Sequence, residues 1–333
     1  MAFENQDVER KTNSILRVLA GSAEPLGSIV IARKLKDHGV DLGERAVRYH
    51  LKLMDEQGLT SLAGRRDGRI ITEAGKKELR QGLVKDKVGF AISRIELLAF
   101  RTTFDLDKRE GSVPVNISIF KQQDFSRALR LMKPIFNTRL CVSNLVIVAG
   151  EGDSIGDMLV PEGKTAIGTV CSIVVNGTLL KAGVPMNSKF GGLLQMEGND
   201  PLRFIELIHY DGCSLDPSEV FIKAKMTSVT QVARTGSGTI LANFREIPAL
   251  CRPLAHEVIN KLAKAKMNGV LCVGNVSEPL CELPIELNRV GMILAGGLNP
   301  IAAVEEAGVE VETHAMSTVV DYRNLVNFEE FSA

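Results

Sequence analysis

Four polar side chains near the N-terminus share one predicted helical face and have the chemistry to bind DNA. They follow the spacing i, i+3, i+4, i+7 and are Arg45, Arg48, Tyr49 and Lys52. If their helix enters a major groove, these four groups can reach phosphates and base edges together. Apolar residues on the other side repeat at i, i+4, i+7, at Val47, Leu51 and Met54. This second pattern predicts the face that packs on the domain.

A basic hairpin is predicted directly after this helix, in the stretch LTSLAGRRDGRIIT. Asp67-Gly68 is a strong signal for a two-residue turn between strands. Three arginines flank the turn: Arg65, Arg66 and Arg69. We expect them to contact the DNA backbone or the minor groove, where contacts add affinity more than sequence choice.

The elements that must position these groups are three helices and a hairpin, which predict a winged helix-turn-helix domain over residues 1–82. The helices are expected at Val8–Leu19, from Ser28 to about Gly39, and at Gly43–Gln57, with a further helix after the hairpin at 73–81. Residues 1–90 carry 17 Lys and Arg against 13 Asp and Glu, and this net charge of +4 suits a partner rich in phosphate. A solvated charged face or a protein-binding winged helix remains the alternative.

Residues 83–333 predict a second domain that is internally duplicated. A shift of about 125 residues lays the segment 93–208 on the segment 218–327. Each copy is expected to be an α+β unit with a strand pair closed by a Gly-Ser turn, a helix, an inner strand and an Asn-containing turn. The fold class is therefore α+β, with a winged helix-turn-helix head before a duplicated body.

The two Asn-containing turns suggest a paired pocket. Gly168–Val184 runs through apolar residues into Asn176-Gly177, and Gly291–Val309 repeats the plan with Asn299-Pro300. Small residues and Asn at a strand end allow close approach of a backbone to a ligand. Between the copies, Phe190-Gly191-Gly192 predicts a loop over the pocket, and Ser214 is expected to cap a helix.

Composition excludes several classes of protein. The 333 residues are 45% hydrophobic and 24% charged, which is ordinary for a globular protein. No apolar run approaches the roughly 20 residues of a membrane span, and the N-terminus lacks a signal-peptide core, so a cytoplasmic location without membrane attachment is expected. The six cysteines form no C-x-x-C pair and predict reduced thiols rather than disulfides, and no metal site is expected.

Catalysis is not predicted. The glycines at 150, 152 and 156 follow an apolar strand and resemble a dinucleotide fingerprint, but Pro161 and Gly163 interrupt the helix that this motif should open. Cys171 would need a positioned base to act as a nucleophile, and none of the five histidines is evidently placed for that role. No cofactor is expected.

The chain resembles the nitrogen regulatory repressor family, NrpR, over about residues 10–327. The resemblance lies in the winged-helix head together with the strings GTVCSIVVNGTLLKAGVP, SKFGGLL, SLDPSEVFI, FREIP and AGGLNPIAAVEEAG. It implies a homodimeric transcriptional repressor that binds inverted-repeat operators of nitrogen-assimilation genes and releases them on binding 2-oxoglutarate. Some family members carry two effector domains after the head, whereas this chain carries one.

An effector of that kind is a dicarboxylate with a keto group, so its site needs cations and hydrogen-bond donors. The candidate effector-binding residues are Cys171, Ser172, Asn176, Lys181, Arg245 and Asn299. Cys171 matches the cysteine of the family's effector motif, which the resemblance implicates in the response to the inducer. The alternative, purely structural roles are a buried strand residue for Cys171, turn geometry for the two asparagines and a solvated side chain for Lys181. Only the resemblance selects 2-oxoglutarate, so a different metabolite or a protein partner stays open.

Overall fold

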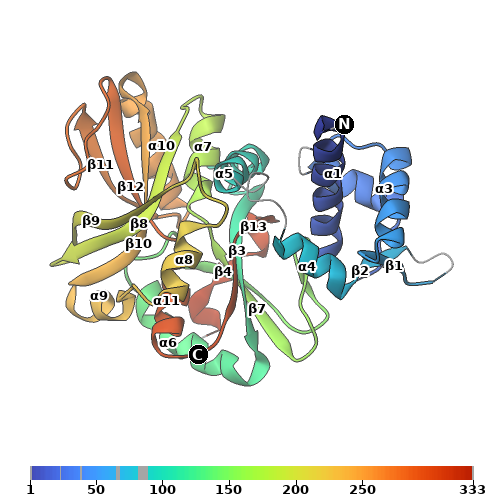
Figure 1. Cartoon of the computed structure of the whole chain (residues 1–333). Helices are drawn as coiled ribbons and strands as arrows, with labels where there is room; N and C mark the ends of the chain where they lie inside the picture. Colours follow the sequence, from blue (N-terminus) through green and yellow to red (C-terminus); the bar gives the residue numbers. More distant parts are fainter. Residues whose placement is uncertain (1, 23, 38–39, 65–67, 82–88, 332–333) are drawn as a thin grey trace. The chain divides into compact units, whose positions relative to one another are not determined.

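The computed structural model describes residues 2–22, 24–37, 40–64, 68–81 and 89–331 (Figure 1). The chain divides into two compact units, one of residues 1–87 with 157–159 and one of residues 88–156 with 160–333. Each unit has its own hydrophobic core, which is the usual mark of a domain. Among the described helices, none combines the length and apolar character that crossing a membrane requires.

The first unit is a winged helix, which confirms the predicted class of the head. Its elements in chain order are α1 (Ala2–Ala20), α2 (Ser28–Asp37), α3 (Glu44–Glu56), β1 (Thr60–Leu62), β2 (Arg69–Ile71) and α4 (Glu73–Gln81). The core takes apolar side chains from all of the first three helices, among them Ile15, Leu35 and Leu51. Val47, Leu51 and Met54 of α3 are all fully buried, so the apolar spacing correctly predicted the inner face of this helix.

The wing hairpin is anchored at its base. β1 and β2 are antiparallel, with Thr60 opposite Ile71 and Leu62 opposite Arg69. Leu26 forms an isolated bridge to Arg69 and so adds a third partner to the pair. Gly68 has a φ of +94°, and a Cβ at this position would lie 2.5 Å from the carbonyl carbon of Leu26. Glycine is therefore required here, both for its backbone conformation and for close packing. Asp67 of the predicted turn lies outside the described residues.

The second unit contains two five-stranded sheets with helices packed against them. Its elements up to the middle of the unit are α5 (Phe90–Arg101), β3 (Ser112–Lys121), α6 (Gln122–Phe136), β4 (Leu145–Ala149), β5 (Ser154–Ile155), β7 (Lys164–Val170), α7 (Ile173–Lys181), β8 (Asn187–Glu197) and β9 (Asp200–His209). The short strand β6 (Met158–Leu159) follows β5 in the chain. The rest are α8 (Pro217–Lys223), α9 (Val229–Thr235), β10 (Gly238–Pro248), α10 (Arg252–Lys264), β11 (Val270–Val276), β12 (Arg289–Ala295), α11 (Asn299–Glu306), β13 (Glu312–Asp321) and β14 (Val326–Asn327). Three short 3-10 turns, η2 (Ala249–Cys251), η3 (Tyr322–Asn324) and η4 (Phe328–Glu330), complete the described elements of this unit.

The two sheets show the predicted duplication and an exchange of strands that was not predicted. The strand orders are β13-β3-β7-β4-β14 and β11-β12-β10-β8-β9, and neighbouring strands in each are antiparallel. The run β3-α6-β4-β7-α7-β8 has the same order of elements as β10-α10-β11-β12-α11-β13. The equivalent strands β8 and β13 begin 125 residues apart, at Asn187 and Glu312. Each of these two strands nevertheless pairs in the other repeat's sheet, so neither repeat has a complete sheet of its own.

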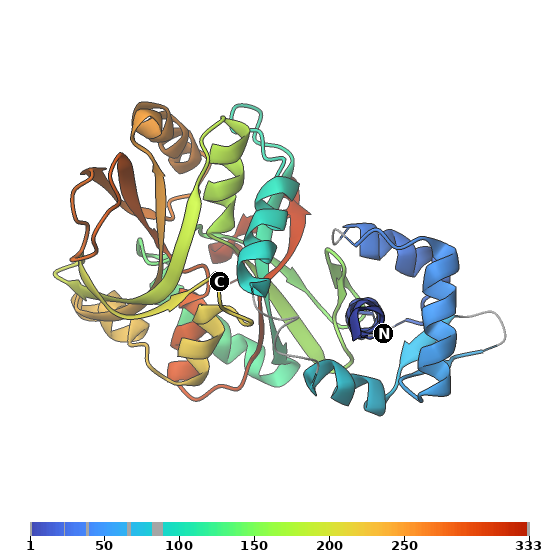
Figure 2. The same cartoon turned by 45° about the horizontal axis from the view of Figure 1, so that its top comes forward.

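The main core joins both sheets. It includes Ile167 of β7, Ile240 of β10 and Ile301 of α11, with further side chains from α6. α6 and α11 lie side by side in both views (Figure 1 and Figure 2). A smaller cluster forms around Ile95 of α5 and Tyr210, together with Cys171 at the end of β7. Because apolar packing links the repeats throughout, the second unit is a single compact body.

The structure corrects the sequence-based expectations for the ends of the strands. β3 follows helix α5, and β10 follows helix α9, so neither Gly-Ser segment closes a strand pair. Asn176-Gly177 lies inside helix α7 rather than in a turn. A Cβ on Gly177 would lie 2.3 Å from the Cβ of Thr102, so glycine permits the close contact between α7 and the end of α5. The Asn-Gly pair therefore reflects helix packing, not turn geometry.

Two expectations for the segment between the repeats are also wrong. Phe190, Gly191 and Gly192 lie within strand β8, not in a loop. The cap of α8 is Asp216, whose Oδ1 accepts a hydrogen bond of 2.8 Å from the backbone N–H of Ser218, rather than Ser214. Pro217 occupies the first turn of this helix, as its type suggested.

Candidate functional site

The outer face of α3 carries the four predicted DNA contacts. Arg45, Arg48, Tyr49 and Lys52 are all exposed, and 60% of the Tyr49 surface is accessible. The buried face of the same helix fixes its rotation, because Val47 and Leu51 cannot leave the core without a large loss of apolar burial. The four polar groups therefore point away from the domain as one set, which is the arrangement that a recognition helix needs.

Arg48 has a partner that the sequence reading overlooked. Its Nη2 forms an ion pair with Oε1 of Glu44, and Ser28 Oγ donates to the same oxygen at 3.2 Å. The i, i+4 spacing of Glu44 and Arg48 is a known signal for such a pair and could have revealed it. The side chain of Arg48 remains 68% exposed, so this pair orients the guanidinium without covering it.

The wing arginines do not behave as one group. Arg69 donates from Nε to Oδ2 of Asp55 at 2.7 Å, and only 21% of its side chain is exposed. Thr60 Oγ1 donates to the other oxygen of Asp55 at 2.6 Å. Arg69 thus ties β2 to the end of α3 and serves the fold of the head. Arg65 and Arg66 lie outside the described residues, so their contacts with DNA remain a prediction.

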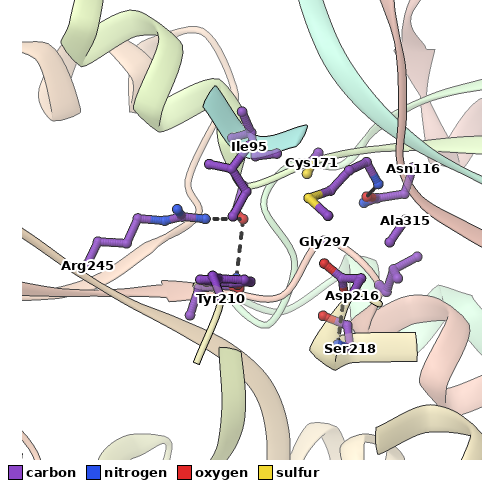
Figure 3. A pocket seen from close by; sticks show the side chains of 14 residues that line it. Ile95, Asn116, Cys171, Tyr210, Asp216, Ser218, Arg245, Gly297 and Ala315 are labelled. Atoms are coloured by element: carbon purple, nitrogen blue, oxygen red, sulfur yellow. Dashed lines mark hydrogen bonds between the residues drawn. The ribbon is translucent and has the colours of Figure 1, made fainter. Parts of the chain in front are cut away.

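The second unit contains a small polar cavity that draws its walls from both repeats (Figure 3). One side of the lining comes from β3, the β7–α7 junction and β13, which supply Asn116, Cys171, Ser172 and Met316. The other side comes from β10 and the start of α8, which supply Asn243, Arg245 and Asp216. The open space is about 20 Å³, enough for about one water molecule. The cavity is therefore narrow in this conformation, and its polar walls already face one another.

Arg245 is the central charge of the cavity. Its side chain is 1% exposed, and within the described part of the chain no carboxylate forms an ion pair with it. Nη1 donates to Ser188 Oγ, Nη2 lies 3.5 Å from Ser172 Oγ, and Nε has no partner among the described residues. Burial lowers the pKa of this guanidinium, which shows how little compensates its charge. A buried cation with an unfilled donor is a ready site for an anion.

Tyr210 and Asn243 extend the polar wall around Arg245. The Tyr210 hydroxyl donates to Oδ1 of Asn243, and Nδ2 of Asn243 donates to Ser172 Oγ at 3.2 Å. The guanidinium carbon of Arg245 lies 5.9 Å from the centre of the Tyr210 ring. Burial raises the pKa of the Tyr210 hydroxyl, so it stays protonated and can serve as a donor. These groups hold Ser172 and Arg245 in fixed positions.

Cys171 lines the cavity as a neutral thiol. Burial raises the pKa of this thiol to about 12, and the nearby charge of Arg245 opposes the rise only weakly. A thiol with such a pKa is neither a nucleophile nor an anion at neutral pH. Its contribution to the cavity is that of a small, weakly polar side chain.

The remaining predicted effector residues occupy three different environments. Asn176 is buried, and its Nδ2 donates to Ser188 Oγ at 3.1 Å, so it supports Arg245 through that serine. Lys181 is exposed and lies with its Nζ 5.0 Å from the centre of the Phe100 ring. Neither Asn176 nor Lys181 lines the cavity, and Lys181 has no link to it through the described contacts.

Asn299 has a structural role in this fold. Its Oδ1 accepts from the backbone N–H of Leu241 at 2.9 Å, and its Nδ2 donates to the carbonyls of Leu140 and Leu241 at 2.7 and 3.0 Å. The residue is fully buried, and these bonds use both its donor and its acceptor atoms. Asn299 starts α11, whereas Asn176 lies inside α7, so the two asparagines are not equivalent positions of the repeats.

A strained turn of β13 forms another wall. Met316 has a φ of +50°, which is unusual for a residue with a side chain, and the pairing of β13 with β3 shifts register at this point. Asn116 accepts from the backbone N–H of Met316 at 3.0 Å, and Arg94 donates to its carbonyl at 2.8 Å. Glu219 accepts from the N–H of Ala315 at 2.6 Å. Side chains from α5, β3 and α8 therefore stabilise the strained backbone beside the cavity.

Asn116, Tyr210, Asp216, Asn243 and Met316 were missed from the sequence. Asn243 and Arg245 are two apart on strand β10, and such spacing puts both on one face of a sheet. This pattern was a usable signal for two of the lining residues. The other four missed residues come from separate elements, and only the folded topology brings them together.

Comparison with known proteins agrees with both units. The family described as NrpR regulatory domains NRD1 and 2 matches residues 88–327, and the Ribonuclease R winged-helix domain matches residues 13–79. The global nitrogen regulator NrpRI of Methanosarcina mazei is 41% identical over 318 residues, which cover 96% of this chain and 98% of that protein.

Two further relatives support the same relationship. The global nitrogen regulator NrpR of Methanocaldococcus jannaschii is 33% identical over 322 residues, covering 96% of this chain but 55% of its own length. The crystal structure of a nitrogen repressor-like protein from Methanococcus jannaschii aligns with a TM-score of 0.61 and 28% identity over 72% of this chain and 98% of that one. This chain therefore belongs to the NrpR family of global nitrogen regulators and is a winged-helix transcriptional regulator, not an enzyme.

Proposed function

We propose that this regulator is a homodimeric repressor of nitrogen-assimilation genes, which binds inverted-repeat operators and releases them when 2-oxoglutarate enters the cavity of the second unit. The observation that carries the effector part is Arg245, a fully buried cation without a carboxylate partner among the described residues. Arginine binds a carboxylate through two parallel donors, and its unfilled Nε leaves room for such a contact.

The small size of the cavity provides a mechanism for the response. A dicarboxylate cannot fit into about 20 Å³, a space for roughly one water molecule, so the walls must separate before it binds. The effector thus selects a second conformation in which the β7–α7 junction, β10 and β13 are further apart. A ligand shifts an equilibrium only by its difference in affinity for two states, and coupled sites usually differ by about 1–3 kcal/mol.

The DNA part rests on the exposed face of α3. In a dimer, two such helices reach successive major grooves when the half-sites lie about one helical turn apart. We assign Arg45, Arg48, Tyr49 and Lys52 to base and phosphate contacts, with Arg65 and Arg66 as further phosphate contacts. Arg69 is assigned to the stability of the wing, because Asp55 already binds its guanidinium.

Fluorescence anisotropy tests the two parts together. Labelled DNA from the upstream region of the gene for this chain and from nitrogen-gene promoters is titrated with protein, with and without millimolar 2-oxoglutarate. Tight binding that the ligand weakens supports the repressor and its inducer. Tight binding that is insensitive to the ligand supports the DNA-binding role but rejects 2-oxoglutarate as the effector. A failure to bind any fragment favours an adaptor that acts through a protein partner.

A second candidate effector is an amino acid, and Asp216 is the observation that favours it. This carboxylate lines the same cavity as Arg245, and an acid opposite a base suits a ligand with both a carboxylate and an ammonium group. A panel of 2-oxoglutarate, glutarate, glutamate and glutamine in the anisotropy assay separates the candidates. Release by glutamate or glutamine alone would replace the dicarboxylate with an amino acid.

A further inference from the structure

Asp216 is the one carboxylate among the described residues that line the cavity. It is half-buried at the start of α8, where its Oδ1 accepts the 2.8 Å hydrogen bond from the N–H of Ser218. Figure 3 shows Asp216 and Arg245 reaching the cavity from different sides, with Tyr210 between them. The two are not ion-paired, so Asp216 is a distant counter-ion for Arg245 rather than a direct partner.

The net charge of the cavity makes a dianion difficult to bind. Arg245 and Asp216 together sum to zero, so a dicarboxylate adds two negative charges that a single guanidinium must balance. Charges removed from water without compensation are strongly disfavoured. This electrostatic cost is reduced if Asp216 either leaves the cavity or takes up a proton.

Packing behind α8 opposes a withdrawal of Asp216 toward the sheet. Gly191 of β8 lies directly against Pro217, and a Cβ on this glycine would lie 2.9 Å from the Cβ of Pro217. The residue after Asp216 therefore rests on the backbone of the sheet and cannot move further toward it. Pro217 and Phe221 of the same short helix are also buried. The start of α8 is thus held in place on its sheet side.

The groups that face Asp216 make protonation the easier route. Among the described residues, Arg245 of β10 is the one cation that acts on Asp216, Tyr210 and Cys171 are neutral, and Glu219 of α8 is a second acid nearby. Burial already raises the pKa of Asp216, although the N–H of Ser218 and the charge of Arg245 oppose the rise. An incoming carboxylate that occupies Arg245 and adds negative charge raises this pKa further.

We propose that Asp216 takes up a proton when the cavity binds a dicarboxylate, and that this residue sets the charge of the ligand that the cavity accepts. The proposal rests on the proposed function, because it concerns the same effector site. A ligand with an ammonium group leaves Asp216 ionised, so its binding is not accompanied by proton uptake. Asp216 is therefore the residue that distinguishes a dicarboxylate from an amino acid.

The sign of the pH effect follows from this linkage. The complex holds one proton more than the free protein, so binding is favoured at low pH and weakens as the pH rises through the range between the free and bound pKa values of Asp216. For uptake of one full proton, the affinity falls by about tenfold per pH unit. The free pKa lies above its usual value of 3.8, and uptake of one full proton at pH 7 requires that binding raise it above neutrality.

Isothermal titration calorimetry tests the proposal on the full-length protein. Titration of 2-oxoglutarate at pH 7 in phosphate and in Tris, whose ionisation enthalpies differ, gives the number of protons taken up. We expect about one proton for the natural chain and close to none for Asp216→Asn. Asparagine caps a helix as well as aspartate does, so α8 is preserved. The variant is also expected to lose most of the pH dependence between pH 6 and 8.

Glu219→Gln is the matched control, because it alters the neighbouring acid and keeps an oxygen to accept from Ala315. Its proton uptake should equal that of the natural chain. Undiminished uptake in Asp216→Asn, or binding by the natural chain without uptake, overturns the role of Asp216 but leaves the effector assignment standing. The absence of any dicarboxylate binding overturns both the proposed effector and this inference.

Discussion

The two units of this regulator each depend on an arginine, and the two arginines occupy opposite environments. Arg48 of α3 is 68% exposed and pairs with Glu44 on the surface. Arg245 of β10 is 1% exposed and has no carboxylate partner among the described residues. A surface guanidinium acts through a screened field and adds affinity for any phosphate. A buried guanidinium discriminates between ligands, because only a matching anion compensates its loss of water.

The difference in exposure between the two arginines also changes how each affects the stability of the fold. The surface pair of Arg48 contributes little to folding, since exposed ion pairs are worth about 0–1 kcal/mol. Arg245 costs folding energy, because its charge is desolvated and its Nε has no partner among the described residues. The proposed DNA contacts of the head therefore need no large effect on its fold, whereas the body carries a destabilising charge that the proposed ligand would compensate.

The largest expected effect comes from Arg245→Met. Methionine has a similar length and no charge, so the free energy of unfolding should stay the same or rise by about 1–2 kcal/mol. The loss of a buried charged contact should weaken 2-oxoglutarate binding by at least about 100-fold. Calorimetric titration measures the affinity, and urea denaturation measures the stability. Ser188 and Ser172 keep Asn176 and Asn243 as partners in this variant.

Arg245→Met should still bind operator DNA with unchanged affinity. A variant that unfolds, or that binds the effector normally, would remove Arg245 from the cavity mechanism. A normal operator response to the ligand in this variant would do the same.

Asn299→Ala tests whether a buried polar residue of the second unit serves the fold rather than the ligand. Asn299 was predicted to contact the effector, but in the structure it completes a hydrogen-bond set in the core. The variant leaves the N–H of Leu241 and the carbonyl of Leu140 unpaired, so the free energy of unfolding should fall by about 2–4 kcal/mol. Asn176→Ala is the matched control and should lose about 1 kcal/mol, since it makes a single described hydrogen bond. Urea denaturation ranks the two, and a reversed order would contradict the structural assignment.

These residues show how far sequence reasoning extends. In the head, one helical periodicity fixes both faces of α3, so the exposed set and the buried set follow from the same spacing. In the body, strand exchange brings β8 beside β10 and β13 beside β3, and no local pattern encodes those pairings. The sequence could identify Arg245, Ser172 and Cys171 as candidates. It could not place Asp216 or Met316 beside them, because those contacts exist only after the repeats have packed together.

Arg48→Ala tests the surface half of the comparison. Loss of one base or phosphate contact should weaken operator binding by about 1–3 kcal/mol and, for a phosphate contact, reduce the salt slope by about one. Arg69→Ala is the matched control in the same domain. It should leave the salt slope unchanged and lower the free energy of unfolding by about 1 kcal/mol, because Arg69 binds Asp55. Anisotropy at several salt concentrations measures both variants, and an unchanged affinity together with an unchanged slope for Arg48→Ala would remove Arg48 from the DNA contacts.

Cys171 is expected to give the smallest effect, although the family resemblance implicates it in the inducer response. With a pKa raised to about 12 by burial, only about one thiol in ten thousand is ionised at pH 8. Iodoacetamide should therefore label Cys171 far more slowly than the half-buried thiols, as mass spectrometry of the native protein can measure. Cys171→Ala should change the affinity for 2-oxoglutarate by less than about threefold, since a weakly polar contact is lost. A tenfold loss of affinity, or rapid labelling that 2-oxoglutarate prevents, would show that effector binding in the cavity depends on the thiol as well as on the charge of Arg245.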